Sequence, residues 1–243
     1  AEGMLRAALL YTLMPLVSTA LIAFAAVGLV LSLGLLRWPI NQLVCRVFGH
    51  AALALAGVRV EISGIEHLAD TRPRVMIQNH GSMLDFLVAG RLAPPRILVV
   101  VKKSMRWLFP VNIGLVLLGS IFVGRDGRGR SHSKLQRVSE QVSLGRRSIV
   151  FSPEGTRSRS GELQAFRSGA FRVAQLSRAE IVPVVIYGAH ALCPPTGWGI
   201  RPGCIRVEVK PPIPAPDPAA DPVELAAEVE QLYRSWLSEA GRA

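Results

Sequence analysis

The most informative segment for the fold is V-M-I-Q-N-H-G-S-M-L-D, residues 75–85. Its first four residues form a short, mostly apolar run, which is typical of a strand covered on both faces. Gly81 then permits a tight turn, and Ser82 is a residue type that often caps a helix. The segment therefore predicts a strand, a turn and a helix in succession. His80 would lie at the carboxyl end of the strand, where open α/β sheets place their functional sites.

The same alternation continues along the rest of the chain. Other short runs rich in β-branched residues occupy 58–62, 97–101, 121–123, 149–151, 181–186 and 205–209. Segments with helical character lie between them, chiefly at 82–92, 131–144 and 168–177. A further helix is expected at 221–240, where Asp221 can cap the start and Pro222 suits the first position. The pattern predicts an α/β fold with a mixed, largely parallel sheet flanked by helices.

The N-terminal segment is apolar over an unusual length. Residues 7–36 contain no charged side chain. A helix of that length would extend about 45 Å, more than the roughly 30 Å of hydrocarbon in a bilayer. Pro15, Gly28 and Gly34 would permit a kink or a re-entrant bend. A cleaved signal peptide is the alternative, but its apolar core is normally only about 7–15 residues long. We therefore expect the N-terminal helical segment to associate with a membrane.

A second helix is expected directly after this segment, at 41–55, with a spacing that suits a helix lying against the bilayer or the domain. Arg37 and Trp38 precede it, and both residue types are common at membrane interfaces. We accordingly divide the chain into a hydrophobic anchor with an interfacial helix, residues 1–56, and a globular domain, residues 57–243.

The protein is strongly basic, with a formal net charge of +11 over 243 residues. Fifteen Lys and Arg residues but only four acids lie between Lys102 and Arg178. This balance indicates an anionic partner. Few aromatic residues accompany the cations, so a nucleic acid is not expected. Because positive charge is retained on the cytoplasmic side, we expect the domain to face the cytoplasm at the cell inner membrane. The three cysteines lack metal-ligand spacing, and neither a metal nor a cofactor is expected.

His80 and Asp85 are candidates for a catalytic pair. Their separation of five residues places them on opposite faces of a strand and far apart around a helix. They can therefore meet only across a turn, which Gly81 can supply. The alternative is that Ser82 and Asp85 form a capping box, in which the carboxylate merely closes the start of the helix. Spacing alone does not separate the two interpretations.

A second candidate segment follows the predicted strand at 149–151. The loop F-S-P-E-G-T-R-S-R-S-G, residues 151–161, offers arginines, hydroxyl groups and glycine-exposed amides that can cradle a phosphate. A solvated turn in which Glu154 pairs with an arginine is the alternative.

Two other predicted strands also end at cations. The strand 97–101 leads to Lys102, and the strand 121–123 leads to Arg125. If these strands are parallel to the others, their ends gather with His80 and Glu154 into one basic cleft.

In combination these segments resemble the glycerolipid acyltransferase family, typified by bacterial 1-acylglycerol-3-phosphate acyltransferases. Residues 79–85 match its N-H-x-x-x-x-D motif, 119–125 resemble G-x-x-F-x-x-R, 154–157 match E-G-T-R, and 182–184 resemble the fourth motif. The segment F-R-S-G-A-F, 166–171, resembles the F-K-x-G-A-F usual after the third. The resemblance spans about residues 58–210, and four ordered motifs are far more specific than any one.

Two positions depart from the family pattern. Ser152 separates Phe151 from Pro153, where the family usually has F-P-E-G-T-R, and Gly124 stands where an acidic residue commonly precedes the arginine. These changes leave the chemistry intact but weaken inference about the acceptor.

The resemblance implies an enzyme, a 1-acylglycerol-3-phosphate O-acyltransferase of phospholipid biosynthesis. It would transfer a fatty acyl group from acyl-CoA or acyl carrier protein to the free sn-2 hydroxyl of 1-acyl-sn-glycerol-3-phosphate (lysophosphatidic acid), giving phosphatidic acid. His80 would be the general base, and Asp85 would hold its imidazole in the right tautomer.

The resemblance also implies where the acceptor binds. Arg125, Arg157 and Lys102 would bind its phosphate. Glu154 and Gly155, with Thr156 of the same motif, would shape its pocket.

Two other functions stay open on sequence grounds. The same chemistry could act on glycerol 3-phosphate, a lyso-ornithine lipid or a glycolipid. A non-catalytic membrane protein that binds anionic lipid is also possible, and the pair of His80 and Asp85 would then be only a helix cap.

Overall fold

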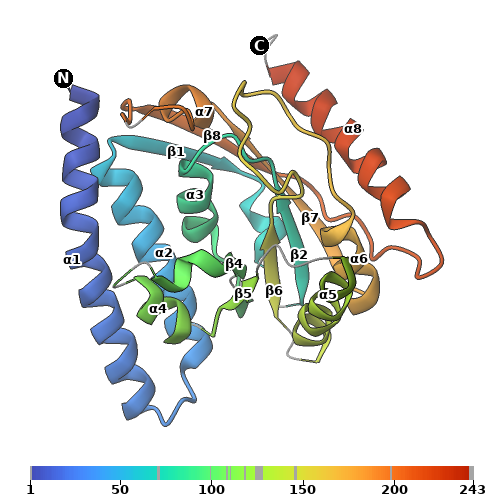
Figure 1. Cartoon of the computed structure of the whole chain (residues 1–243), viewed down its shortest axis with the longest axis horizontal. Helices are drawn as coiled ribbons and strands as arrows, with labels where there is room; N and C mark the ends of the chain where they lie inside the picture. Colours follow the sequence, from blue (N-terminus) through green and yellow to red (C-terminus); the bar gives the residue numbers. More distant parts are fainter. Residues whose placement is uncertain are drawn as a thin grey trace.

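The computed structural model of the protein describes residues 2–69, 72–98, 100–107, 109, 111–117, 119–123, 128–144, 147–197 and 199–240. Its centre is a six-stranded sheet in the order β1-β8-β7-β2-β6-β3 (Figure 1). The strands are β1 (Val58–Ser63), β2 (Arg74–Gln78), β3 (Ile97–Leu98), β6 (Ser148–Phe151), β7 (Glu180–Tyr187) and β8 (Gly203–Val209). Every neighbouring pair is parallel except β7 with β8. The expected mixed, largely parallel sheet is confirmed.

Two further strands, β4 (Val100–Lys102) and β5 (Ile121–Val123), form a separate two-stranded parallel sheet. The prediction of a single strand over 97–101 is therefore wrong. The chain leaves the edge of the main sheet after β3, because β4 pairs with β5 instead. Consequently the ends of β4 and β5 do not join those of β2 and β6 at one sheet edge, as the sequence suggested.

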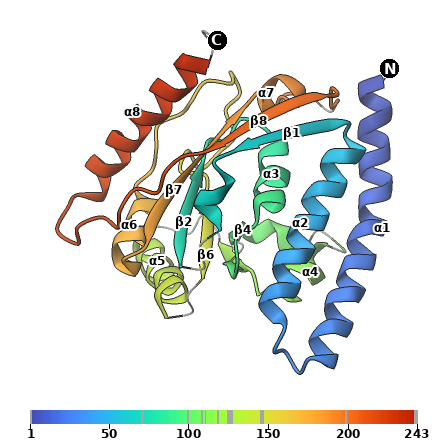
Figure 2. The ribbon, with the colours of Figure 1, turned by 180° about the vertical axis from the view of Figure 1, so that it is seen from behind.

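Helices cover both faces of the main sheet (Figures 1 and 2). One face carries α1 (Glu2–Leu31), α2 (Arg37–Leu55), α3 (Leu84–Leu92) and α4 (Val111–Leu117), and the other carries α5 (Arg128–Ser143), α6 (Gly169–Ser177) and α8 (Pro222–Ala240). The connections contain α7 (Ala189–Leu192) and the 3-10 helices η1 (Ile65–Leu68) and η2 (Lys103–Trp107). The longer helices match the predicted segments, whereas α4 and α7 are too short to show a helical period in the sequence.

The strand β2 separates two hydrophobic cores. Met76 packs in the core that includes Leu53 of α2 and Leu84 of α3. Val75 and Ile77 pack in the core on the opposite face, against α5, α6 and α8. Successive side chains of a strand point to opposite faces, so a strand covered on both sides has to be apolar throughout.

The helix α1 continues through Pro15 and ends at Leu31. The chain then reverses direction at residues 32–36, where Leu33 and Gly34 have φ angles of 48° and 79°. Of the positions expected to permit a bend, Gly34 is the one that lies in the turn. Among the described residues, α1 is the one helix that is long and apolar enough to cross a membrane.

This helix lies along the domain rather than projecting from it (Figure 1). Leu10 and Met14 are buried in the core beneath it. Near its first turn, the carbonyl oxygen of Gly3 accepts a hydrogen bond from the N–H of Ile200 at 3.3 Å. Other positions face outward, with Leu16 67% exposed and Val30 73% exposed. One side of α1 therefore contacts protein along the helix, while the other side is apolar and uncovered.

A tyrosine from α8 holds the end of β2. The hydroxyl group of Tyr233, which is fully buried, donates to the carbonyl oxygen of Ile77 at 2.7 Å and accepts from the N–H of Val184 at 3.0 Å. Two residues further on, the side-chain amide of Asn79 donates to the carbonyl of Ile186 and accepts from its N–H, both at 2.8 Å. Side chains thus link the ends of β2 and β7, just before His80.

We predict that Tyr233→Phe lowers the free energy of unfolding by about 1–3 kcal/mol, because a buried carbonyl and a buried N–H lose their partner. Denaturant unfolding in detergent micelles measures the change. Tyr11→Phe is the matched control: Tyr11 is 51% exposed, so its loss should stay within about 0.5 kcal/mol. Equal effects of the two substitutions would show that the buried hydroxyl is not a structural link.

Candidate active site

The turn after β2 brings His80 and Asp85 together. Nδ1 of His80 lies 3.1 Å from Oδ2 of Asp85. The same carboxylate oxygen accepts hydrogen bonds from the backbone N–H groups of Gly81 and Ser82, each at 2.8 Å. The side chain of Asp85 is 1% exposed, whereas that of His80 is 24% exposed. The imidazole therefore reaches solvent while it contacts a buried carboxylate that two backbone N–H groups hold in place.

The structure shows one half of the capping box beside the histidine contact. Asp85 accepts from the N–H of Ser82, as the carboxylate of a capping box does. The hydroxyl of Ser82 instead accepts from the N–H of Leu84 at 3.2 Å, and the residue before the helix, Met83, makes no side-chain cap. Because Asp85 accepts at Nδ1, the neutral imidazole carries its proton there and Nε2 keeps a free lone pair.

Glu154 fixes the backbone of His80 from the neighbouring loop after β6. Its Oε1 accepts from the N–H of His80 at 2.6 Å, and its Oε2 accepts from the N–H of Gln164 at 2.9 Å. In return, the carbonyl of His80 accepts from the N–H of Ser158 at 2.9 Å. Burial raises the pKa of Glu154, an effect that the two N–H groups oppose. Glu154 thus holds two backbone N–H groups in place, and it forms no ion pair with an arginine among the described residues.

Gly155 and Arg167 form the next part of the loop. Gly155 has a φ angle of +73°, and a Cβ atom there would lie 2.9 Å from Nε of Arg167. The guanidinium group therefore packs directly against this glycine. Arg167 was not among the predicted site residues, although the segment 166–171 that contains it was part of the family resemblance.

The remaining predicted residues do not enter the site in the same way. Thr156 bonds to Gln164 through its carbonyl oxygen, at 3.1 Å from Nε2, and Arg157 is exposed. Neither lines a cavity of the described site. Lys102 ends β4, but its side chain lies outside what the structure describes, and Arg125 lies outside the described residues altogether.

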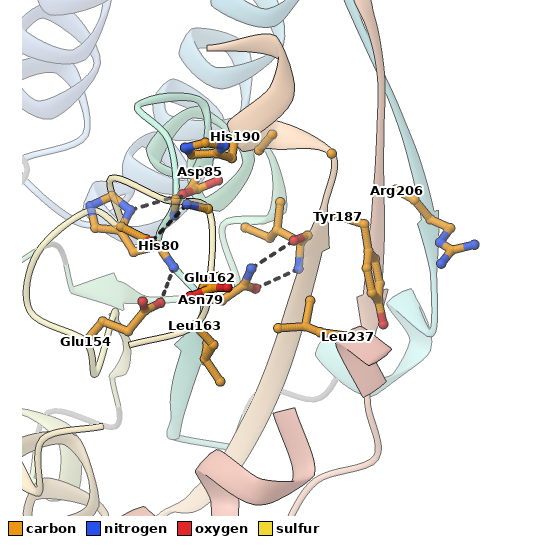
Figure 3. A pocket seen from close by; sticks show the side chains of 16 residues that line it. Asn79, His80, Asp85, Glu154, Glu162, Leu163, Tyr187, His190, Arg206 and Leu237 are labelled. Carbon is orange, nitrogen blue, oxygen red and sulfur yellow. Dashed lines mark hydrogen bonds and ion pairs between the residues drawn. The ribbon is translucent and has the colours of Figure 1, made fainter. Parts of the chain in front are cut away.

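Two cavities meet at His80. The more polar of the two, hereafter the polar cavity, has a volume of about 280 Å³ and a mixed wall that includes Asn79, Asp85, Glu162 and His190 (Figure 3). A second cavity of about 530 Å³ lies between the helices α1 to α4 and the sheet, and its wall is mostly apolar. Among the described residues, His80 is the only one that lines both.

One cysteine thiol lies in the wall of the apolar cavity. Cys45 of α2 lines this cavity, and burial raises its pKa to about 11. A thiolate is thus strongly disfavoured there, as expected for a site that suits a hydrocarbon chain.

His190 is a site residue that the sequence did not reveal. It follows β7 and is distant in the sequence from the other site segments. In space it lies between the two loops that carry His80 and Glu154 (Figure 3). Its Nε2 lies 3.3 Å from the carbonyl oxygen of Arg159. A Cβ atom at Gly161, where φ is +86°, would lie 2.8 Å from its Nδ1. No motif surrounds His190, so only its tertiary position marks it.

These features define a class: an α/β protein with a histidine–aspartate pair at the carboxyl edge of its sheet, between a polar and an apolar cavity. The sequence pattern of the family described as Acyltransferase matches residues 59–187, more than half of the chain. The chain therefore belongs to the acyltransferase family.

Named relatives are similar to much of the chain. A 1-acyl-sn-glycerol-3-phosphate acyltransferase of Saccharomyces cerevisiae is 33% identical over 82% of this chain and 66% of its own length. An alpha form from Mus musculus is 30% identical over 65% of this chain and 59% of its own length. An enzyme of the same name from Limnanthes douglasii is 30% identical over 84% of this chain and 73% of its own length. The chain thus spans about two thirds of the length of the curated relatives that it matches.

The fold is also similar to that of a solved structure. The crystal structure of the 1-acyl-sn-glycerophosphate (LPA) acyltransferase PlsC from Thermotoga maritima superposes with a TM-score of 0.78, covering 98% of this chain and 97% of that one. The two sequences are 20% identical, so the likeness establishes the α/β fold with its N-terminal apolar helix.

We predict that neutral His80 carries its proton on Nδ1, because Asp85 accepts there. Long-range ¹H–¹⁵N correlation spectra of histidine-labelled protein in micelles report the tautomer of each of the five histidines, and His80→Gln assigns the signal. Asp85→Asn should redistribute the proton towards Nε2. A signal from the Nε2–H tautomer in the unaltered protein would contradict the geometry.

Proposed function

We propose that the protein transfers a fatty acyl group from an acyl thioester to the free sn-2 hydroxyl of 1-acyl-sn-glycerol-3-phosphate, giving phosphatidic acid. The position of His80 carries this proposal, because it faces a polar cavity on one side and an apolar cavity on the other. A glycerophosphate head and a long acyl chain need such neighbouring environments. The names of the relatives support the choice of acceptor.

In the proposed reaction, Nε2 of His80 removes the proton from the acceptor hydroxyl as its oxygen attacks the thioester carbonyl. The tetrahedral intermediate collapses, the carbon–sulfur bond breaks, and the imidazolium returns the proton to the leaving thiolate. Asp85 stabilises the imidazolium through Nδ1–H. A positioned base of this kind typically contributes about 10²–10⁴ in rate. The transfer is direct, and the chain has no G-x-S-x-G segment that would supply a serine nucleophile.

The acyl chain of the donor would occupy the cavity between α1, α2, α3 and α4, whose volume of about 530 Å³ is in the usual range for a ligand site. Acyl-CoA or acyl carrier protein would serve as the donor, as a co-substrate, and the reaction needs no further cofactor.

Cations would bind the phosphate of the acceptor. Arg157 lies on the same loop as Glu154. We assign it, with Lys102 and Arg125 of the family motifs, to phosphate binding. Each charge-assisted hydrogen bond to phosphate contributes roughly 1.5–3 kcal/mol.

The acyltransferase domain, residues 57–243, would work at the cytoplasmic face of the inner membrane, with residues 1–56 as its anchor. We propose that α1 enters one leaflet rather than spanning the bilayer. Its inner side packs on the domain, with Leu10 and Met14 in the core, so a spanning position would carry the polar surface of the domain into the hydrocarbon. The exposed apolar side and the turn at 32–36 supply the membrane-facing surface.

We predict that His80→Ala lowers acyl transfer by at least about 10²-fold, because the base is removed. Release of free thiol from acyl-CoA in the presence of lysophosphatidic acid measures the rate. His190→Ala is the matched control, since His190 lines the same polar cavity but not the apolar one, and it should retain activity within about ten-fold.

Undiminished turnover in His80→Ala would exclude His80 as the base. An acceptor panel with glycerol 3-phosphate, a lyso-ornithine lipid and a glycolipid completes this experiment. Faster turnover with any of these than with lysophosphatidic acid would contradict the proposed acceptor while leaving the chemistry at His80 intact.

A further inference from the structure

Two arginines share one aromatic ring beside the turn between α1 and α2. Arg37 is the first residue of α2, and its Cζ lies 5.5 Å from the ring centroid of Trp38. Arg147 directly precedes β6, and its Cζ lies 4.5 Å from the same centroid. A side chain at Gly119 would clash with the guanidinium group of Arg37, so the start of β5 also borders this cluster.

No carboxylate among the described residues pairs with either guanidinium group. Among the described residues, the Nε atoms of Arg37 and Arg147 are buried without a hydrogen-bond partner, and the same holds for the hydroxyl group of Ser120. Within that part of the chain, the guanidinium group of Arg147 donates only to the neutral side chain of Gln141. Burial, with the charge of Arg37 as a second cause, lowers the pKa of Arg147. Two like charges thus lie together with unused donors.

Such an arrangement is incomplete without an anion. Buried N–H groups that lack a hydrogen-bond partner destabilise the folded protein. A guanidinium group is a planar donor fork that matches the oxygens of a phosphate group, and two forks with one hydroxyl can bind its three outer oxygens. Phosphate is therefore the ligand chemistry that the cluster fits.

The cluster lies opposite the catalytic edge of the sheet. β2 and β6 are parallel neighbours, so the residue that precedes β6 and the residues that follow β2 lie at opposite edges. Arg147 is before the start of β6, whereas His80 follows the end of β2. The phosphate of a substrate bound at His80 is consequently not the ligand of this cluster.

The neighbourhood identifies the source of the phosphate as a lipid. Arg37 directly follows the turn at 32–36, in which Leu33 is 89% exposed and Leu35 is 84% exposed. Leucine side chains this exposed to water are stabilised by transfer into hydrocarbon. A Trp with adjacent Arg residues is typical of the head-group level of a membrane. A turn that enters the bilayer would hold the two arginines at the depth of the phosphates.

We propose that Arg37 and Arg147, arranged around Trp38, bind the phosphate group of an anionic membrane phospholipid. The inference rests on the proposed association with the bilayer, but it is independent of the reaction at His80. The lipid is a structural ligand of the docked protein and not a substrate.

Binding to vesicles tests the proposal. Vesicles of phosphatidylcholine alone are compared with vesicles that also contain phosphatidylglycerol, using the full chain in a flotation assay. We expect Arg37→Gln with Arg147→Gln to lose roughly ten-fold or more of the affinity gained from phosphatidylglycerol, since each arginine near an anionic surface contributes about five-fold. Arg59→Gln with Arg201→Gln changes the net charge equally on exposed strand-edge and loop positions, and it should bind within about two-fold of the unaltered protein.

Two further comparisons distinguish a specific phosphate site from general electrostatic attraction to the vesicle and from binding of free phosphate. Arg37→Lys with Arg147→Lys keeps both charges but removes the forks, so its affinity should fall by several-fold, and binding equal to the unaltered protein would overturn the proposal. The proposal also fails if the glutamine pair binds phosphatidylglycerol vesicles normally. It fails in that case even if inorganic phosphate raises the melting temperature of the unaltered protein and not that of the glutamine pair, because the ligand would then be free phosphate.

Failure of this site and failure of the proposed function are distinguishable. Acyl transfer to dispersed acceptor in detergent should stay within about two-fold in the glutamine pair, because His80 lies at the other sheet edge, and this activity also shows that the variant is folded. If the unaltered protein fails to bind either vesicle, both the membrane association and the lipid site are wrong, whatever the activity in detergent.

Discussion

The structure depends on the convergence of three donors on one carboxylate oxygen. Oδ2 of Asp85 accepts from the N–H groups of Gly81 and Ser82 and meets Nδ1 of His80. These contacts close the turn, start α3 and aim the imidazole at the same time. Glu154 adds a second constraint from β6, because it accepts the N–H of His80. Ring and backbone are thus held from two strands, which leaves Nε2 as the free, accessible atom.

The position of His80 depends on the contacts that link the neighbouring strands and on the two cavities beside them. Near the carboxyl ends of β2 and β7, the hydroxyl of Tyr233 and the amide of Asn79 link the two strands through side-chain to backbone hydrogen bonds. The polar cavity forms in that region, while α1 to α4 enclose the apolar cavity on one face of the sheet. The histidine at the junction can therefore face a polar head group and a hydrocarbon chain together.

Local chemistry explains what the sequence could predict. The turn at 79–85, the loop at 151–161 and the strands around them are encoded by adjacent residues, so a turn that could bring His80 to Asp85 was predictable, although spacing did not decide between a catalytic pair and a helix cap. The break between β3 and β4 was not, because it results from pairing with β5. His190 and the packing of Arg167 on Gly155 were also hidden, since each depends on contacts between distant segments. The apolar length of α1 predicted a membrane segment, but only its packing on the domain shows which side of the helix is left uncovered.

A structure of the protein with a thioether analogue of acyl-CoA, in which a methylene group replaces the thioester carbonyl, tests the central claim most directly. The account predicts that the acyl chain lies in the apolar cavity between α1 and α4, with the replaced carbon next to Nε2 of His80 and the polar cavity left for the acceptor. An acyl chain outside that cavity, or a replaced carbon remote from His80, would contradict the account.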